Sequence, residues 1–347
     1  MIEVDGAWGE GGGQLLRIAV AMAAVTGKAI RVSHIRARRR NPGLAPQHVA
    51  AVRAVASVCD AQCEGVEPRS TTITFAPRRL RGGDFRVDVG TAGSITLVLQ
   101  ALLPAFVASH ERCCATLRGG TDVRAAPPVD YLRRVLLPLV GKMGVRAELT
   151  VLRRGYYPKG GGEVRLELAP TPLLQPFVVE DPGRLEGIRI HAHVAQLARE
   201  IAERMESAAR LALPPELAVR SEIEVCEPAC SDGPGGAIVL RALSAHTTLG
   251  AAQIAERGVR AEVLGQRAAE MLRRDLRAGA TLDLHASDQM LIFLALADGP
   301  SAFRASGITL HARTAMWLLE QLAGTGFVVT PLGAGFRVQV TNRADHH

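Results

Sequence analysis

The sequence predicts an α/β protein built from repeated units, with a smaller α/β domain inserted into one of them. Three observations lead to this prediction. Helix-like apolar patterns alternate with short β-like segments along the chain. Glycine-rich turns recur at intervals, which indicates a structural repeat. A late segment of about 90 residues has a complete alternation of its own and is long enough to form its own core.

The first part of the chain contains a series of helical patterns. We expect helices at residues 14–26, 46–58, 92–109 and 128–142. The first is followed by Gly27, and the second starts with Pro46, whose fixed φ suits a first helical turn. Short β-like segments flank these helices, at residues 29–32, 72–75, 85–89, 147–151 and 163–168.

The glycine-rich turns divide these elements into units. The stretch GEGGGQLLR opens the first unit, VGTAGSITLVLQ opens the second, and YYPKGGGEV lies at the start of a third. A proline-containing stretch at residues 172–183 then interrupts the third unit. We therefore expect one domain of three repeats at residues 1–183 and 280–341, and an inserted domain at residues 184–279.

The inserted segment has its own series of strands and helices. We expect strands at residues 188–194, 222–225 and 236–243, and helices at residues 198–212 and 260–277. After it, the third unit is completed by helices at residues 287–296 and 315–323 and strands at residues 307–310 and 326–329.

Composition places the chain among cytoplasmic globular proteins. Of its 347 residues, 48% are apolar, which is enough for sizeable cores. The longest apolar runs, such as residues 95–109, contain Gln100 and Pro104 and are too short to span a bilayer. No basic, apolar signal segment opens the sequence. We expect a cytoplasmic protein without a membrane partner.

The six cysteines predict reduced structural thiols. They form no CxxC pair and have no accompanying histidine cluster of the kind that binds zinc. A redox pair of Cys226 and Cys230 is the alternative.

The formal net charge is +7, and arginines cluster at residues 36–40, 78–81 and 153–154. Such clusters suit the phosphates of a nucleotide or of a nucleic acid backbone. A solvated basic surface explains the same pattern equally well.

The opening stretch carries five glycines between Gly6 and Gly13, with Glu10 among them, directly before a helix. Backbone N–H groups at such a place can approach an anion. The stretch fits neither a Walker loop nor a Rossmann fingerprint, since the required spacing is absent. A tight turn is the alternative interpretation.

Three further stretches have residue types suited to chemistry. Residues 34–48 combine arginines, which bind phosphates in a directed way, with Gln47 in the first turn of a helix. Residues 119–131 form a rigid loop before a helix, where either a site wall or simple turn formation explains them. His311 follows a short β pattern and precedes a helix, so we expect it at a strand end, as either a catalytic or a structural histidine.

Taken together, these stretches resemble the RNA 3′-terminal phosphate cyclase family. The resemblance covers nearly the whole chain, and the motifs occur in the family's order. They are DGAWGEGGGQLLR, IRARRRNPGLAPQH, GTAGSITLVLQALLP, GGTDVRAAPPVDYLRRVLLPL, GYYPKGGGEV, DQMLIFLALADG and ITLHARTAMWLLEQL.

The resemblance implies a fold of three repeats, each a four-stranded sheet with two helices, plus an inserted α/β domain. It also implies an ATP-dependent enzyme that acts on RNA 3′-phosphate ends. A histidine attacks the α-phosphate of ATP, AMP passes to the RNA 3′-phosphate, and the neighbouring 2′-OH closes a 2′,3′-cyclic phosphate. A divalent metal, Mg²⁺ or Mn²⁺, would offset charge on the ATP phosphates. No obligate protein partner is implied.

The same resemblance implies roles for individual residues. His311 is the nucleophile. The first motif supplies nucleotide- or metal-site residues, and these are Glu10, Gln14 and Arg17. Positions that contact phosphates of ATP or of the RNA end are Arg36, Arg39 and Gln47. The positions that lie beside the adenosine or line the nucleotide are Asp288, Gln289 and Pro128.

The sequence departs from the family pattern at two positions. Arg38 stands where the family usually has a glycine, and His285 stands where it often has a tyrosine that stacks on adenine. Three alternatives remain: a cyclase-like RNA-binding or RNA-processing factor without catalysis, a nucleic-acid-binding module with a structural His311, and an enolpyruvyl transferase. The presence of His311 in ITLHART argues against the first of these.

Overall fold

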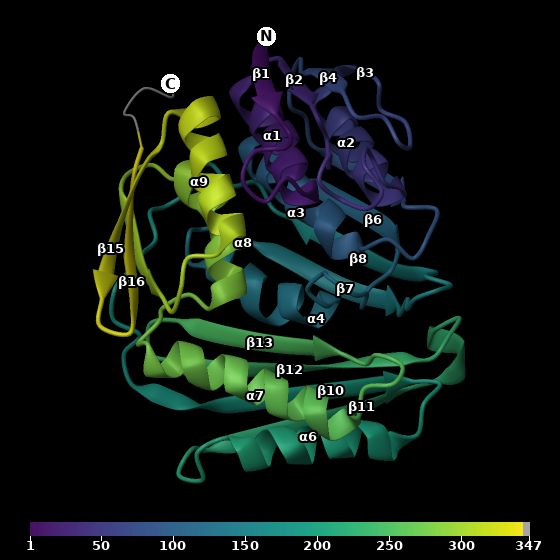
Figure 1. Ribbon diagram of the computed structural model, residues 1–347, viewed down its shortest axis with the longest axis vertical. Coiled ribbons are helices and arrows are strands. Elements are labelled where there is room, and N and C mark those ends of the chain that lie inside the picture. The colour runs from purple at the N-terminus through teal and green to yellow at the C-terminus, as the bar shows by residue number, and fades with distance from the viewer. Residues whose placement is uncertain (343–347) are drawn as a thin grey trace.

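The computed structural model describes residues 1–342 and contains four mixed four-stranded sheets with helices packed against them (Figure 1). This confirms the predicted α/β class with repeated sheet units. Among the described residues, no helix is both long and apolar enough to cross a lipid bilayer.

Three of the sheets share one topology. Their strand orders are β1 (Ile2–Asp5), β2 (Ile30–Ser33), β4 (Ile73–Ala76), β3 (Gln62–Glu64); β5 (Gly83–Asp88), β6 (Cys113–Gly119), β8 (Gly162–Leu168), β7 (Ala147–Arg153); and β9 (Val178–Val179), β14 (Ser301–Ala305), β16 (Gly335–Thr341), β15 (Gly326–Leu332). In each sheet the first two strands are parallel and the other neighbours are antiparallel. Each sheet is therefore a copy of the same β-α-β-α-β-β unit.

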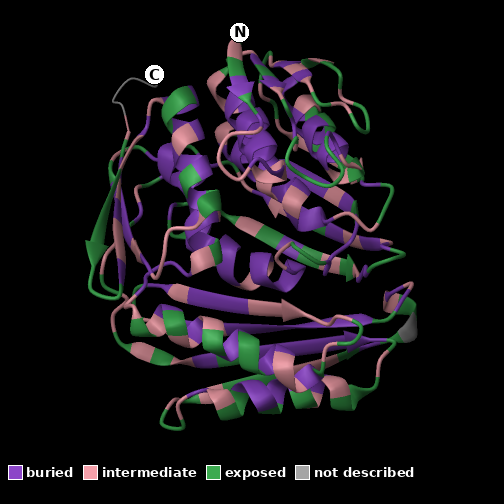
Figure 2. Ribbon diagram, viewed as in Figure 1, coloured by how far each residue is buried: buried purple, intermediate pink, exposed green. Residues whose placement is uncertain are grey.

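The helices of the three units meet in the middle of the molecule. They are α1 (Gly13–Thr26) and α2 (Pro46–Cys59); α3 (Ile95–Ala108) and a second helix formed by α4 (Val129–Tyr131), a π-helical turn (Leu132–Leu136) and α5 (Leu137–Gly141); and α8 (Leu284–Ala295) and α9 (Leu310–Ala323). Helix α1 packs against α2, α3 and α9, and α8 packs against α9. Because α1, α3 and α8 are apolar on most of their circumference, they are buried almost throughout (Figure 2). One hydrophobic core runs through all three units.

The segment between β9 and α8 forms the fourth sheet. Its elements are β10 (Leu185–Ala195), α6 (Arg199–Ala212), β11 (Val219–Cys226), a 3₁₀ turn (Pro228–Cys230), β12 (Gly235–Ser244), β13 (Thr248–Ile254) and α7 (Ala261–Arg277). The strand order β11-β10-β12-β13 differs from that of the repeats. Helices α6 and α7 are amphipathic and cover one face of this sheet, where they share a separate hydrophobic core with it (Figure 1). We propose the domain division at residues 184–279 on this basis.

The opposite face of the fourth sheet lies against the second repeat. Strand β13 contacts α4 and the π-helical turn that follows it. The two termini of the insertion connect to the third repeat, so the insertion is in contact with two repeats at once (Figure 1).

Two sequence predictions about the repeats are wrong. The YYPKGGGEV stretch lies in the second sheet, between β7 and β8, and the third unit begins at β9 instead. Residues 307–310 are no strand, because Thr309 caps α9; the strand is β14, a few residues earlier. Several strands were also missed, namely β1, β3, β6, β9, β13 and β16. β3 and β9 are too short for an alternating pattern to show, and β6 begins with the small residues Cys113, Cys114 and Ala115, which are all buried and do not alternate.

Candidate active site

His311 lies in the first turn of α9. Thr309 ends the extended segment before it, because its hydroxyl accepts a hydrogen bond from the Ala312 N–H at 2.8 Å and caps the helix. The prediction that His311 lies at a strand end is therefore wrong, since β14 already ends at Ala305. The His311 side chain is 48% exposed, which leaves the imidazole accessible to a ligand.

The glycine-rich opening loop packs directly on α9. Gly9 has a φ of +58°, a left-handed conformation that side-chain-bearing residues rarely adopt. With the chain turned in this way, the Glu10 N–H donates to Thr314 Oγ1 at 3.1 Å. A Cβ at Gly12 would overlap the Glu10 carboxylate, so any other residue there would displace that carboxylate from its present position. The loop serves to hold Glu10 against α9.

The Glu10 carboxylate contacts two other residues predicted to belong to the site. Its Oε2 lies 3.7 Å from His311 Nδ1, and its Oε1 forms an ion pair with Arg39. Only 13% of the Glu10 side chain is exposed. Three residues from the first loop, the arginine cluster and the last helix are thus brought together.

The surroundings of His311 favour its neutral form. Burial is the largest cause, and the positive charges of Arg17 and Arg39 add to it; together they hold the pKa of His311 below its usual 6.5. The imidazole is therefore unprotonated at neutral pH, the form in which a ring nitrogen can act as a nucleophile.

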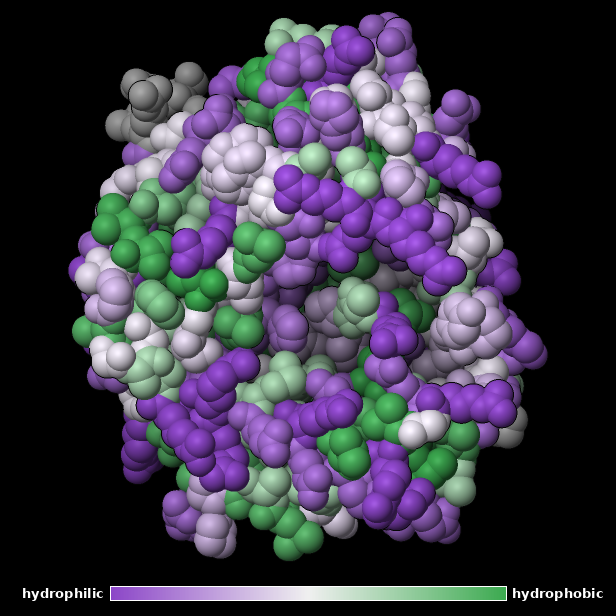
Figure 3. Space-filling view, viewed as in Figure 1, coloured by the Kyte–Doolittle hydropathy of each residue, from purple (hydrophilic) through white to green (hydrophobic). Residues whose placement is uncertain are grey.

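A cavity of about 410 Å³ adjoins His311. Seven residues expected at the site line it, namely Gln14, Arg17, Pro128, His285, Asp288, Gln289 and His311. They come from α1, α8, α9 and the loop before α4. Figure 3 shows that this face of the molecule is hollowed between the repeats and the insertion, with hydrophilic side chains around the hollow.

Arg17 and Gln14 form one wall of this cavity from α1. Arg17 is buried and donates to Gln100 Oε1 at 3.2 Å, and burial lowers its pKa to about 10, so it stays charged at neutral pH. Within residues 1–342, the buried Oε1 of Gln14 has no hydrogen-bond partner. A free acceptor beside a buried cation suits a ligand that carries both a negative charge and a hydrogen-bond donor.

Residues of α8 form the facing wall. Thr309 Oγ1 donates to Asp288 Oδ1 at 2.7 Å, and burial raises the pKa of Asp288 to about 7. Gln289 Nε2 donates to the His285 carbonyl at 3.3 Å. The His285 ring meets the Tyr131 ring edge-on, with centroids 6.2 Å apart.

Arg36 and Gln47 do not line this cavity. Arg36 Nη1 donates to the Gly43 carbonyl at 2.8 Å and so holds its own loop together. Gln47 Oε1 accepts from the Ser94 N–H at 3.1 Å, at the start of α3. Their roles as phosphate contacts remain predictions.

Sequence reasoning missed the contribution of the insertion to the cavity. Ala252, Gln253 and Ile254 of β13 line it, together with Glu256. Glu256 Oε2 lies 3.7 Å from Arg124 Nε, so an ion pair links the insertion to the loop before α4. No motif could indicate this, because the contact depends on how the fourth sheet packs on the second repeat.

His48 was also given no role, although it lies close to Arg17 and Gly13. Its Nδ1 accepts from the Ala45 N–H at 3.0 Å, and burial together with Arg17 and Arg36 lowers its pKa to about 3. It is a neutral residue that supports the arrangement of α1 and α2.

Comparison with known proteins identifies the family of this site. A family model described as RNA 3′-terminal phosphate cyclase matches residues 8–329. The chain belongs to the RNA 3′-terminal phosphate cyclase family. A protein of that name from Nitrosospira multiformis is 51% identical over 95% of this chain and 94% of its own length. Proteins of the same name from Methanopyrus kandleri and Korarchaeum cryptofilum are 47% and 44% identical, over 92% and 94% of this chain and 93% and 94% of their own lengths.

Membership of the cyclase family confirms the resemblance read from the motifs and shows that the protein is an enzyme. It argues against an enolpyruvyl transferase. Arg38 departs from the family pattern, which usually has a glycine at this position. Between β2 and α2 the residues with left-handed φ are His34, Arg36 and Gly43, and Arg38 is not among them. This cyclase loop therefore does not require a glycine at that position.

Proposed function

We propose that this protein converts an RNA 3′-phosphate into a 2′,3′-cyclic phosphate with ATP, through a covalent histidinyl-AMP on His311. One observation carries the proposal: a half-exposed imidazole, kept neutral, lies at the cavity with its Nδ1 facing the Glu10 carboxylate. Relatives named RNA 3′-terminal phosphate cyclase support the overall reaction.

In the first step His311 attacks the α-phosphorus of ATP. With Nδ1 directed at Glu10, Nε2 is the nitrogen with a free lone pair. A bond forms between Nε2 and phosphorus, and the bond from phosphorus to the departing pyrophosphate breaks. Arg39 and Arg17, which flank the imidazole, would stabilise the negative charge that develops on the phosphates.

In the second step an oxygen of the RNA 3′-phosphate attacks the α-phosphorus of histidinyl-AMP. The phosphorus–nitrogen bond breaks, which frees His311 and leaves an RNA-adenylate. The 2′-OH then attacks the 3′-phosphorus, loses its proton, and displaces AMP as the ring closes. A phosphate monoester has no good leaving group, and AMP supplies one; the adjacent hydroxyl needs little reorientation.

The cavity is the proposed binding site for ATP. We propose that Gln14, Pro128 and His285 line the nucleotide, with Asp288 and Gln289 beside the adenosine. Arg36, Arg39 and Gln47 are proposed to contact phosphates of ATP or of the RNA end. The arginine cluster at residues 36–40 would attract RNA through its backbone charge.

A divalent metal, Mg²⁺ or Mn²⁺, is proposed to accompany ATP, held by Glu10. A single protein carboxylate together with substrate phosphates is the usual way in which Mg²⁺ is bound. Glu10 fits, because its carboxylate is directed into the site beside His311. When bound, the ion would offset negative charge on the phosphates.

Labelled ATP tests the proposal. Protein, metal and ATP labelled at the α-phosphate should give a covalent AMP adduct that is labile to acid and stable to alkali, as a phosphoramidate is. His311→Ala should abolish it. The matched control is His246→Ala, at an exposed histidine of the insertion. An adduct that persists unchanged in His311→Ala would refute the assignment.

The same assay separates the enzyme from the non-catalytic alternative. A protein that binds RNA 3′-ends but forms no adduct and no cyclic phosphate would be a cyclase-like RNA-binding factor. A cytoplasmic location remains a prediction from the sequence, and fractionation of cells that express the protein tests it.

A further inference from the structure

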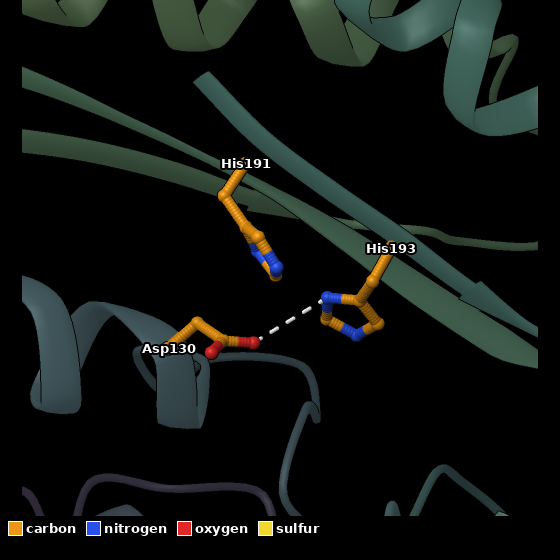
Figure 4. Close-up of side chains that lie close together, drawn as sticks. All are labelled: Asp130, His191 and His193. Carbon is orange, nitrogen blue, oxygen red and sulfur yellow. Dashed lines mark ion pairs between the residues drawn. The ribbon is translucent and has the colours of Figure 1, made fainter. Parts of the chain in front are cut away.

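A buried cluster of metal-ligating side chains joins the insertion to the second repeat, apart from the cavity described above. His191 and His193 lie on β10, and Asp130 lies on α4. One potential ligand atom from each lies within 4.8 Å of the others. Figure 4 shows both imidazoles and the carboxylate converging on one point between the sheet and the helix. We propose that this cluster is a structural site for a transition-metal ion of the Zn²⁺ type.

Unpartnered buried nitrogens are the first reason for this proposal. His193 is completely buried, and neither of its ring nitrogens has a hydrogen-bond partner within residues 1–342. His191 is 3% exposed, and its Nδ1 is likewise without a partner there. A buried polar atom without a partner costs free energy, and a bound metal ion removes that cost.

The spacing of one pair of ligand atoms also suits a small metal ion. His193 Nδ1 lies 3.4 Å from Asp130 Oδ2. Bonds of about 2.0–2.1 Å in a tetrahedral site place neighbouring ligand atoms about 3.3–3.4 Å apart. Two imidazoles and one carboxylate are ligands that Zn²⁺ accepts, and water would fill the fourth position of the tetrahedron.

Two of the three proposed ligands are oriented by another group through a remaining polar atom. His191 Nε2 lies 3.1 Å from Glu224 Oε2, and this contact leaves Nδ1 for the metal. The nearest carboxylate to His193 Nε2 is that of Asp122, whose Oδ2 lies 3.7 Å away, beyond hydrogen-bond range. Asp130 Oδ1 accepts from Arg133 Nη2 at 2.5 Å. Carboxylates behind ligating histidines are the usual supporting arrangement at metal sites.

Arg154, with 4% of its side chain exposed, is the most deeply buried of the described arginines that contact Asp130. Its Nη1 donates to Asp130 Oδ2 at 2.5 Å, but a carboxylate oxygen has two lone pairs and can also bind a metal. Asp122 and Glu224 face the same guanidinium, at 3.7 and 3.4 Å. Arg133 and Arg134 also contact Asp130 Oδ1, at 2.5 and 3.6 Å, and their side chains are 31% and 19% exposed. The unpartnered buried imidazole nitrogens, and not an excess of negative charge, therefore favour a metal ion here.

The position of the cluster indicates what the ion would do. It would tie β10 of the insertion to α4, the short helix that begins at Pro128 beside the ATP cavity. A cleft of about 330 Å³ lies next to the cluster and is lined in part by its neighbours Arg133, Arg154 and Glu224. The ion would fix the insertion against the repeats without entering the reaction.

Metal analysis of the purified protein tests the proposal. The wild-type chain, without nucleotide, should bind one Zn²⁺ tightly, measured by elemental analysis and by competition with a chromogenic chelator. His193→Gln should lose this ion, and Glu224→Gln should bind it about 10- to 100-fold more weakly, as removal of a supporting carboxylate does. His246→Gln and Glu10→Gln are the controls and should retain it, because Glu10 belongs to the separate metal site proposed with ATP.

The proposal is overturned if the wild-type chain binds no Zn²⁺ tightly, or if His193→Gln binds it as the wild type does. If His193→Gln fails to fold, the visible absorption spectrum of the wild-type chain loaded with Co²⁺ tests the proposed ligands instead. The intense visible bands of a tetrahedral site without thiolate charge-transfer absorption support the proposed ligands. A weak octahedral spectrum, or thiolate bands from the nearby Cys226 or Cys230, contradicts them.

Discussion

The hydroxyl of Thr309 donates to Asp288 Oδ1 at 2.7 Å and accepts from the Ala312 N–H at 2.8 Å. One side chain thus joins α8 to the first turn of α9, the turn that carries His311. The bond fixes the position of His311 relative to the wall of the cavity. Asp288 is buried, and this burial raises the pKa of its carboxyl to about 7, although the Thr309 hydrogen bond acts in the opposite direction.

Asp288→Asn should stabilise the protein at neutral and alkaline pH. The folded-state pKa of Asp288 is raised from 3.8 to about 7, so the unfolded chain loses this proton first. The free energy of unfolding of the wild type therefore falls as the pH rises from about 4 to about 7. The total loss is about 4 kcal/mol, because one unit of pKa shift corresponds to about 1.36 kcal/mol. Asparagine keeps the oxygen that Thr309 binds and removes the charge. In urea unfolding, Asp288→Asn and the wild type should have nearly equal free energies of unfolding at about pH 4. Above about pH 7 the variant should be more stable by the full amount.

The control for this prediction is Asp298→Asn, at an exposed carboxylate just after the same helix. It should leave the free energy of unfolding unchanged over the whole pH range. A destabilised Asp288→Asn at alkaline pH would show that the ionised carboxylate has a partner that compensates for its burial.

Glu10→Gln should slow formation of the histidinyl-AMP adduct by about a hundredfold. A loss of this size is typical when a side chain that orients or exchanges a proton with the reacting group is removed. Glutamine keeps the shape but loses the charge that faces His311 Nδ1 and pairs with Arg39. Single-turnover adenylation measures the effect. Asp5→Asn is a matched control, because Asp5 contacts His34 at 3.1 Å on the exposed surface. Equal rates in both variants would remove Glu10 from the site.

Much of the cavity was predictable because its residues belong to short motifs. Gln14 and Arg17 follow the glycine-rich turn, and Asp288 and Gln289 are adjacent in the sequence, so helical periodicity alone places each pair on one element. That these pairs line one cavity with His311 depends on the packing of α1, α8 and α9. The family resemblance, and not helical periodicity, predicted that these residues and His311 belong to one site.

Other features could not be predicted, for identifiable physical reasons. The pattern of Ile308 and Thr309 is β-like, but the Thr309 side chain caps a helix, and the cap overrides the local propensity. His191 and His193 alternate along a strand and therefore face the same side, yet their partner Asp130 is far away in the sequence. Only the packing of the insertion on the second repeat brings them together.

Arg39→Ala should weaken the use of ATP or of the RNA end without unfolding the protein, and should also shift the pH profile of adenylation. Burial, Arg17 and Arg39 hold the pKa of His311 below 6.5, and the neutral imidazole is the nucleophile. Adduct formation therefore falls as the pH drops through this pKa. Without Arg39 the pKa moves back toward 6.5, so the acidic limb shifts to higher pH.

Rates of adduct formation between about pH 5 and about pH 8 measure this shift. Arg40→Ala, at an exposed neighbour in the same cluster, should keep the wild-type profile. Unchanged kinetics together with an unshifted limb in Arg39→Ala would remove Arg39 from the site.

Glu256→Gln tests whether the insertion helps to hold ATP. Glu256 lines the cavity and lies 3.7 Å from Arg124, so the pair links the insertion to the loop before α4 across the cavity edge. Both side chains are more than a third exposed, so the pair should contribute little to stability, about 0–1 kcal/mol. We expect a KM for ATP raised by up to about fivefold, with kcat unchanged, since 1.4 kcal/mol corresponds to tenfold.

Arg124→Gln should give the same increase, and the double variant should add little further, because either change breaks the same contact. Steady-state kinetics over a range of ATP concentrations, with unfolding curves alongside, measures both effects. Additive increases would mean that the two residues act separately. A lower kcat at an unchanged KM would place Glu256 in the chemical step and not in the holding of ATP.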